Sequence, residues 1–245
     1  MEKLVELAKE KFIKNEQQQV YFTGDDKVDI FLNDLEKHPH VFVLGCLMDR
    51  QIKAERAWKI PYDVWQIIGS KEITDWEERT EEEYIEIFTD KNLHRFPETM
   101  AKVFHQALLR IREVYEFDVS RIWSGSPSSA SVVYQFLQFN GCGIKISTMA
   151  ANILARDFKV PLSDHFSIDI SPDVHIVRVM KRTGLVDKDA NNDKIIYKAR
   201  ELNPEYPGII DISCWEIGKT YCRPNNPDCE NCIINNECKK RIGLK

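Results

Sequence analysis

The chain has 245 residues, 43% of them hydrophobic and 30% charged, and a net charge of −5. These values are typical of a globular protein with a sizeable core, and they exclude a disordered polar chain. The longest apolar run, residues 41–48, is too short to span a bilayer, and the charged N-terminus is unlike a signal peptide. We therefore expect no membrane association and a place in the cytoplasm, or in the nucleus of a eukaryote.

Apolar residues recur at helical spacing along most of the chain. The clearest example is 97–117, where Met100, Phe104 and Ile111 share one face and Pro97 suits the first turn. No segment alternates like a strand, and no Asn-Gly or Asp-Gly pair suggests a hairpin between strands. The sequence therefore predicts an all-α protein with helices at about 2–14, 26–37, 40–48, 52–58, 62–69, 81–89, 97–117, 128–139, 144–157, 173–182, 192–202 and 209–221.

A Gly-x-Gly turn, Gly141 and Gly143 in "FNGCGIK", separates two predicted helices at 139–145. Two glycines allow a sharp turn and expose backbone N–H groups at the start of the next helix, where they can bind a phosphate oxygen. An ordinary turn between helices has the same pattern, and no strand precedes it as a dinucleotide site would require.

A further helix opens at Asp173 in "SPDVHIVRV". Aspartate is favoured at a helix start because its carboxylate accepts hydrogen bonds from the first backbone N–H groups. By the same plain interpretation, His175 is a half-buried histidine and Arg178 a solvated surface charge. Nothing in this segment alone requires a chemical role.

Four cysteines, Cys222, Cys229, Cys232 and Cys238, are spaced C-x6-C-x2-C-x5-C near the C-terminus. In a reducing compartment such a group more often binds metal than forms disulfides. Zinc sites usually have two Cys-x(2–4)-Cys pairs, and this segment has one. The spacing favours a four-iron cluster, with zinc and metal-free thiols as the alternatives.

In this order, the three segments resemble the helix-hairpin-helix DNA glycosylases of the endonuclease III family. "FNGCGIK" is similar to the family's hairpin, "PDVHIVRV" to its catalytic helix, and the cysteine spacing matches its [4Fe–4S] loop. "WEIGKTYC" at 215–222 also looks like the family's approach to its first cysteine. The clear match covers about 139–241.

The resemblance implies roles for particular residues. Lys145 stands where bifunctional members keep their nucleophile, and Asp173 where they keep the catalytic carboxylate. Two sets of residues are implied to bind DNA and metal: DNA at Gly141, Gly143, Ile144, His175, Arg178, Lys239 and Lys240, and a [4Fe–4S] cluster at Cys222, Cys229, Cys232 and Cys238.

The implied architecture has two lobes. We expect a helical barrel at 30–160 that contains the helix-hairpin-helix at about 136–157, and a second lobe made of 1–29 and 161–245 with the cluster loop at 222–238. The interval of 28 positions between Lys145 and Asp173 exceeds the family's usual one. The family's glutamine-bearing loop is replaced by 45–58, where Gln51 is the glutamine.

The implied function is base excision repair. A bifunctional glycosylase and AP lyase would excise a damaged, oxidised base from duplex DNA through a Schiff base on Lys145, acting as a monomer near the nucleoid or in a nucleus. Two alternatives stay open: a monofunctional glycosylase for a mismatched or deaminated base, and a non-catalytic protein that binds DNA or abasic sites.

Overall fold

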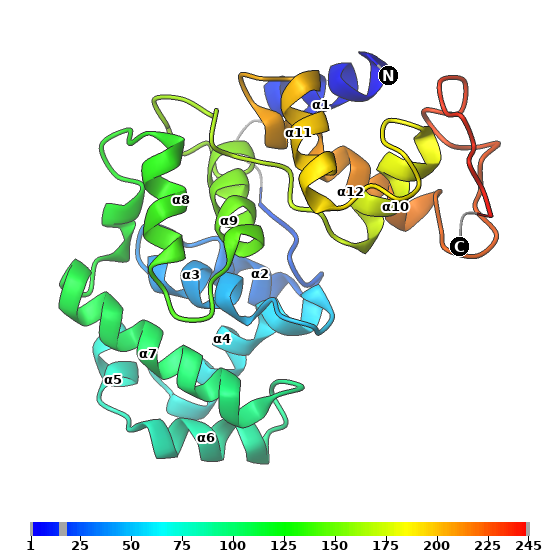
Figure 1. Ribbon diagram of the computed structural model, residues 1–245. Helices are drawn as coiled ribbons and strands as arrows, with labels where there is room; N and C mark the ends of the chain where they lie inside the picture. The colour runs from blue at the N-terminus through cyan, green and yellow to red at the C-terminus, as the bar shows by residue number, and fades with distance from the viewer. Residues whose placement is uncertain (1, 15–18, 244–245) are drawn as a thin grey trace.

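The protein is built from helices. The computed structural model describes residues 2–14 and 19–243, and within them it contains helices and no strand (Figure 1). This confirms the all-α prediction. The α-helices are α1 Glu2–Lys14, α2 Asp26–Leu32, α3 Pro39–Met48, α4 Ala54–Ile68, α5 Ile73–Glu77, α6 Glu81–Asp90, α7 Pro97–Tyr115, α8 Ser129–Leu137, α9 Ile144–Arg156, α10 Val174–Thr183, α11 Asn192–Leu202 and α12 Asp211–Thr220, with 3-10 helices η1 Val119–Ile122 and η2 Pro207–Ile210.

The region 52–69 differs from the prediction. Two helices were expected at 52–58 and 62–69, but α4 is a single helix with Pro61 in its interior. Proline removes one helical hydrogen bond and disfavours a helix interior. Its ring is buried together with Trp58 and Val64 on the same helix, so packing of this face offsets the loss.

The second predicted helix ends earlier than expected. Its pattern runs over 26–37, but α2 ends at Leu32 because Asn33 binds the backbone on both sides. The Asn33 amide donates to the carbonyl of Asp29, and its oxygen accepts from the N–H of Val20 at 2.8 Å. These bonds also hold residues 20–22 against the helices that follow. The short α5 and both 3-10 helices were not predicted.

A first group of helices surrounds α3, which is buried along its whole length. Helices α2, α4, α7 and α9 all pack against it (Figure 1). At the centre, the Phe42 ring has ring centroids of Trp58, Trp123, Phe136 and Phe158 within 5.4–6.5 Å. Burial of these aromatic side chains makes α3 the axis of this part of the fold.

A second group consists of α1, α10, α11, η2 and α12 (Figure 1). It joins the first group through α9, where the Asn152 amide donates to the Gly208 carbonyl at 2.9 Å and accepts from the Tyr206 hydroxyl at 2.6 Å. The arrangement agrees with a two-lobed fold. The lobe boundaries at 30 and 160 stay a prediction. Residues 1, 15–18 and 244–245 of the predicted second lobe lie outside the described residues.

Helices α10 and α12 approach each other closely at Gly218. A Cβ atom on Gly218 would lie 2.7 Å from the Cβ of His175, so only glycine allows this crossing. The contact matters because α10 begins directly after Asp173. Within the described residues, no helix is long and apolar enough to cross a membrane.

Candidate active site

The hairpin between α8 and α9 is formed by the predicted Gly-x-Gly turn. Gly141 has φ of +77°, a conformation that side chains with a Cβ avoid. Gly143 directly precedes α9, and no side chain caps this helix start. Ile144 is 54% exposed beside it. The turn thus presents uncapped backbone N–H groups at an exposed helix terminus, as an anion site requires.

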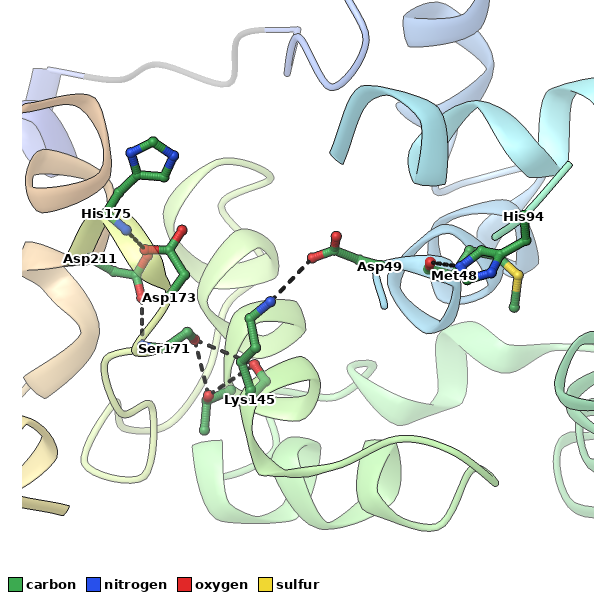
Figure 2. A network of polar contacts seen from close by, with 9 residues as sticks. Met48, Asp49, His94, Lys145, Ser171, Asp173, His175 and Asp211 are labelled. Atoms are coloured by element: carbon green, nitrogen blue, oxygen red, sulfur yellow. Dashed lines mark hydrogen bonds and ion pairs between the residues drawn. The ribbon is translucent and has the colours of Figure 1, made fainter. Parts of the chain in front are cut away.

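Lys145 lies in the first turn of α9, and its side chain points toward the end of α3. Its Nζ is 3.6 Å from Oδ2 of Asp49, at the end of α3 (Figure 2). The Lys145 side chain is 46% exposed, whereas that of Asp49 is 13% exposed. Burial raises the pKa of Asp49, and Lys145 opposes this shift. Asp49 was not selected from its sequence position.

A buried histidine that sequence reasoning also missed, His94, fixes the backbone just before Asp49. His94 Nδ1 accepts a hydrogen bond from the Phe96 N–H, so its Nε2 donates to the carbonyl of Met48 at 3.2 Å (Figure 2). Burial lowers the pKa of His94, which favours this neutral form. The ring ties the loop before α7 to the last residue of α3, and thereby fixes the residue that follows.

Asp173 caps α10, as its position in the sequence predicts. Its Oδ1 accepts from the N–H groups of His175 at 2.8 Å and Ile176 at 2.7 Å. Within the described residues, Oδ2 has no hydrogen-bond partner. The carboxylate is therefore fixed in orientation by one oxygen and can offer the other to a ligand.

Ser171 links the Lys145 and Asp173 segments. Its N–H donates to Oδ2 of Asp211 at 2.7 Å. Its hydroxyl lies 3.1 Å from that of Thr148 and 3.4 Å from the carbonyl oxygen of Lys145 (Figure 2). The start of α9, the approach to α10 and the start of α12 thus share one hydrogen-bond network.

A cavity of about 1140 Å³ lies at this meeting point, and Lys145, Asp173, Asp49 and Asp211 all line it. Its volume is at the upper end of the range of ligand sites. Burial raises the pKa of Asp211 to about 6, and the Asp173 carboxylate acts in the same direction. The other lining residues include an aromatic and basic set: Tyr21, Phe22, Trp58, Trp215, Lys53, Lys181, Arg182 and Lys219.

The other predicted DNA-binding residues are more scattered. His175 and Arg178 line the cavity, but Arg178 is engaged within the protein: its Nη2 donates to His175 Nδ1 at 2.9 Å and to the Gly218 carbonyl at 2.8 Å, and its Nε donates to the Cys222 carbonyl. Lys239 and Lys240 are exposed beside the cysteine segment. That each contacts DNA stays a prediction.

The four predicted metal ligands gather around one pocket. Cys222, Cys229, Cys232 and Cys238 all line it, and none forms a disulfide. The N–H of Lys240 lies 3.3 Å from the Cys238 sulfur. Burial raises the pKa of Cys232 and Cys238, and the neighbouring cysteines add to this. Within residues 2–14 and 19–243, no three His, Cys, Asp or Glu side chains converge on a point that a single metal ion could occupy.

The two acids that sequence reasoning missed carried weak signals. Asp49 directly follows the apolar run 41–48, where a charge must lie at the edge of the core. Asp211 lies in the first turn of a helix, where an acidic residue is explained by the helix dipole alone. Their common position at the cavity follows from packing between distant segments.

Comparisons with known proteins agree with this fold. No protein-family model matches the chain. Endonuclease III of Thermotoga maritima is 27% identical over 179 residues, which cover 66% of this chain and 78% of that protein. A trapped covalent endonuclease III–DNA intermediate superposes with a TM-score of 0.65 at 14% identity, covering 97% of this chain and 93% of that one.

A thermostable thymine-DNA glycosylase gives a TM-score of 0.64 at 16% identity, over 98% of this chain and 95% of that one. The likeness to these solved structures concerns the fold, whereas the likeness to the Thermotoga protein extends to the sequence. The chain thus has the fold of endonuclease III and of a thymine-DNA glycosylase, and its sequence is similar to that of an endonuclease III.

Proposed function

We propose that the protein is a base excision repair glycosylase with AP lyase activity that excises an oxidised base from duplex DNA. Lys145 is its nucleophile and Asp173 its catalytic carboxylate. The observation that carries this proposal is that both side chains line one cavity, although they come from different groups of helices. The protein acts as a monomer in the cytoplasm, at the nucleoid, or in the nucleus of a eukaryote.

The chemistry requires access to C1′ of a nucleotide turned out of the duplex. The cavity of about 1140 Å³ has room for such a nucleotide, and Trp58 and Trp215 in its walls offer apolar surface to a base. As the glycosidic bond breaks, positive charge develops on the sugar. The free oxygen of Asp173, held by two backbone N–H groups through the other oxygen, stabilises that charge.

The Lys145 amine, in its neutral form, then attacks C1′ and forms a covalent bond to the sugar. Ring opening gives a Schiff base, and β-elimination cleaves the strand 3′ to the lesion. The position of Lys145 in the first turn of α9 supports this step, because the hydroxyls of Ser171 and Thr148 lie near its carbonyl oxygen and hold this turn beside the Asp173 segment.

DNA binding is assigned to the hairpin and to the basic residues near the cysteines. Uncapped N–H groups at Ile144 and Lys145 suit a phosphate oxygen, and the helix dipole adds to the attraction. Lys239 and Lys240 supply exposed positive charge on the second group of helices. His175 and Arg178 order α10 beside the cavity.

The cysteine segment fits a [4Fe–4S] cluster held by Cys222, Cys229, Cys232 and Cys238. Four soft donors line one pocket, and their spacing in the sequence, with a single Cys-x2-Cys pair, suits a four-iron cluster better than a zinc site. When bound, the cluster cross-links residues 222–238. The chain's own part is to keep the thiolates in place, with an N–H group of Lys240 at one sulfur.

Borohydride trapping on a panel of duplexes, each with one modified base, tests the proposal. The wild type should form a covalent adduct on at least one oxidised-base duplex. Lys145→Gln should bind without trapping or cleaving, and Asp173→Asn should bind and lose most of its rate. Lys102→Gln, on the outer face of α7 and paired with Glu81, is the matched control and should behave as wild type.

A monofunctional glycosylase is the second candidate, and the ion pair of Lys145 with Asp49 favours it because the pair already engages the lysine side chain. In that case Lys145→Gln would still release free base and leave the abasic strand intact. A protein that binds every duplex without releasing any base would be the non-catalytic alternative.

A further inference from the structure

Asp173 and Asp211 both line the cavity, and each uses one carboxylate oxygen to bind backbone N–H groups. Asp173 uses Oδ1 for the N–H groups at the start of α10, and Asp211 uses Oδ2 for the N–H of Ser171. Within the described residues, the second oxygen of each has no hydrogen-bond partner. Because Ser171 and Asp173 are two positions apart, each acid presents a free oxygen to the cavity from neighbouring points of its wall.

The groups around Asp211 differ from those around Asp173. Asp211 is half-buried at the cavity wall, at the start of α12. Arg156 stands nearby, but its guanidinium is already paired in a two-bond contact with Asp157. Titratable and charged groups face Asp211 from every element packed against it: Lys145 and Arg156 on α9, Asp173 before α10, His175 on α10, Tyr206 before η2 and Cys214 on α12. On α1, Lys11 is paired with Glu216 instead.

This environment changes the protonation of Asp211. Burial raises the pKa of Asp211 to about 6, the neighbouring Asp173 acts in the same direction, and Arg156 opposes both. A carboxyl group whose pKa is raised by burial is a usual proton donor when a second carboxyl group beside it stabilises charge.

We propose that Asp211 is a catalytic acid that donates a proton to the departing base while Asp173 stabilises the sugar cation. This rests on the proposed glycosylase function and adds a residue to it. The site takes a base with a protonatable ring nitrogen or carbonyl oxygen that can reach the start of α12.

The C1′–N bond breaks with its electron pair going to the base, and the Asp211 carboxyl proton moves to the base, which leaves neutral. The lone pair of the neutral Lys145 amine then forms the N–C1′ bond. The resulting secondary ammonium loses a proton to the Asp211 carboxylate, which regenerates the acid before ring opening.

Other titratable groups in the cavity are less suited to this step. Asp49 is paired with Lys145 and lies on the opposite side of the lysine from Asp173 and Asp211 (Figure 2). Nδ1 of His175 already accepts a hydrogen bond from the Arg178 guanidinium. Asp211, in contrast, has one carboxylate oxygen in the cavity that is free of hydrogen-bond partners within the described residues. Its other oxygen accepts from the N–H of Ser171, which lies two positions before Asp173.

Single-turnover base release between pH 5 and 8.5 tests the proposal. The wild-type rate should fall about tenfold per pH unit above pH about 6, as the acid ionises. Asp211→Asn should be at least about 100-fold slower at pH 6 and should lack this descending limb. Asp211→Glu should recover part of the rate. Glu216→Gln, on the same helix and outside the cavity, is the control and should match wild type.

Thermal unfolding and DNA affinity of Asp211→Asn should show that the variant is folded and binds. Carboxyl-carbon NMR gives a readout that is independent of activity: the signal lost in Asp211→Asn should titrate near pH 6 in the wild type and at lower pH in Asp173→Asn. An Asp211→Asn rate within about twofold of wild type, or a carboxyl that titrates below about pH 5, would overturn the inference. A wild type that releases no base overturns the proposed function itself, whatever the variants do.

Discussion

Nζ of Lys145 lies 3.6 Å from Oδ2 of Asp49, so the start of α9 and the end of α3 are joined by an ion pair at the cavity wall. The lysine is half exposed, and such a pair contributes only about 0.2–1 kcal/mol to stability. Its main consequence is positional, because the Lys145 side chain must leave Asp49 before its amine can reach the sugar in the proposed reaction.

Asp49→Asn should therefore trap faster than wild type. Removal of the negative charge releases the amine, and we expect an increase of about two- to fivefold at pH 7, matching the energy of the pair. Initial rates of borohydride trapping measure it. Glu55→Gln breaks the Lys219 ion pair at the same cavity and should leave the rate unchanged. Slower trapping in Asp49→Asn would make Asp49 a proton acceptor instead.

Asp211 should make stability depend on pH. Its pKa is raised from 3.8 to about 6 on folding, so the folded state holds its proton more tightly than the unfolded state. The stabilisation is present in full below pH about 4 and is lost as the pH rises to about 6, a change of about 3 kcal/mol. Urea unfolding should show that the free energy of unfolding of Asp211→Asn, relative to that of wild type, is about 3 kcal/mol higher at pH 7 than at pH 4. An unchanged difference would contradict the burial of this acid.

The two hairpin glycines should respond differently to substitution. Gly141→Ala forces a Cβ into a positive φ and to within 2.8 Å of Arg50 Nη1, so it should lower the free energy of unfolding by about 1–2 kcal/mol. Gly143→Leu has ordinary backbone angles and no atom within 4 Å of its Cβ, so the fold should tolerate it.

In DNA-binding assays, Gly143→Leu should nevertheless bind more weakly to every duplex, because the side chain would stand between the α9 terminus and the phosphate. Normal binding by Gly143→Leu would place the DNA elsewhere on the surface.

Charge reversal at Lys239 and Lys240 should weaken DNA binding to all sequences alike. Each lysine that contacts a phosphate contributes about one unit to the slope of log affinity against log salt. The double variant Lys239→Glu, Lys240→Glu should lose about two units, as measured by titrations at several salt concentrations. Lys188→Glu and Lys194→Glu on the same group of helices form the matched control. Equal slopes in both double variants would remove this surface from the DNA interface.

The cysteines should divide into two classes. Protein purified without oxygen should contain about four iron and four sulfide per chain, and serine at any of the four pocket cysteines should reduce both. Alanine at Cys46, Cys142 or Cys214, which are buried in the core, should leave the iron content unchanged. Stoichiometric zinc with no iron would replace the cluster by the zinc alternative.

Local patterns in the sequence predicted most helices because each buries one periodic face, as α7 does with Met100, Phe104 and Ile111. The same reasoning divided α4 at Pro61, since the penalty of a proline is local and the packing that overcomes it is not. The helix after Asp25 was drawn too long because the Asn33 contact with Val20 depends on a chain reversal that no periodicity encodes.

Within the cavity, the sequence pointed to Lys145 and Asp173 because each belongs to a motif of its own. It did not point to Asp49 or Asp211, which reach the cavity from positions 96 residues before and 38 residues after those two. An isolated aspartate carries no sign of its final neighbours. Only packing of α3, α9 and α12 shows that three acids and one amine line the same cavity.

The guanidinium of Arg178 connects α10 to the start of the cysteine segment. It binds the carbonyls of Cys222 and Gly218 and the ring of His175, so one side chain clamps the first cysteine to the helix that begins at Asp173. Disorder that begins at the cysteine segment would remove a partner from this clamp and loosen the cap of α10. The orientation of the Asp173 carboxylate therefore depends on order in a segment that begins 49 positions later in the chain.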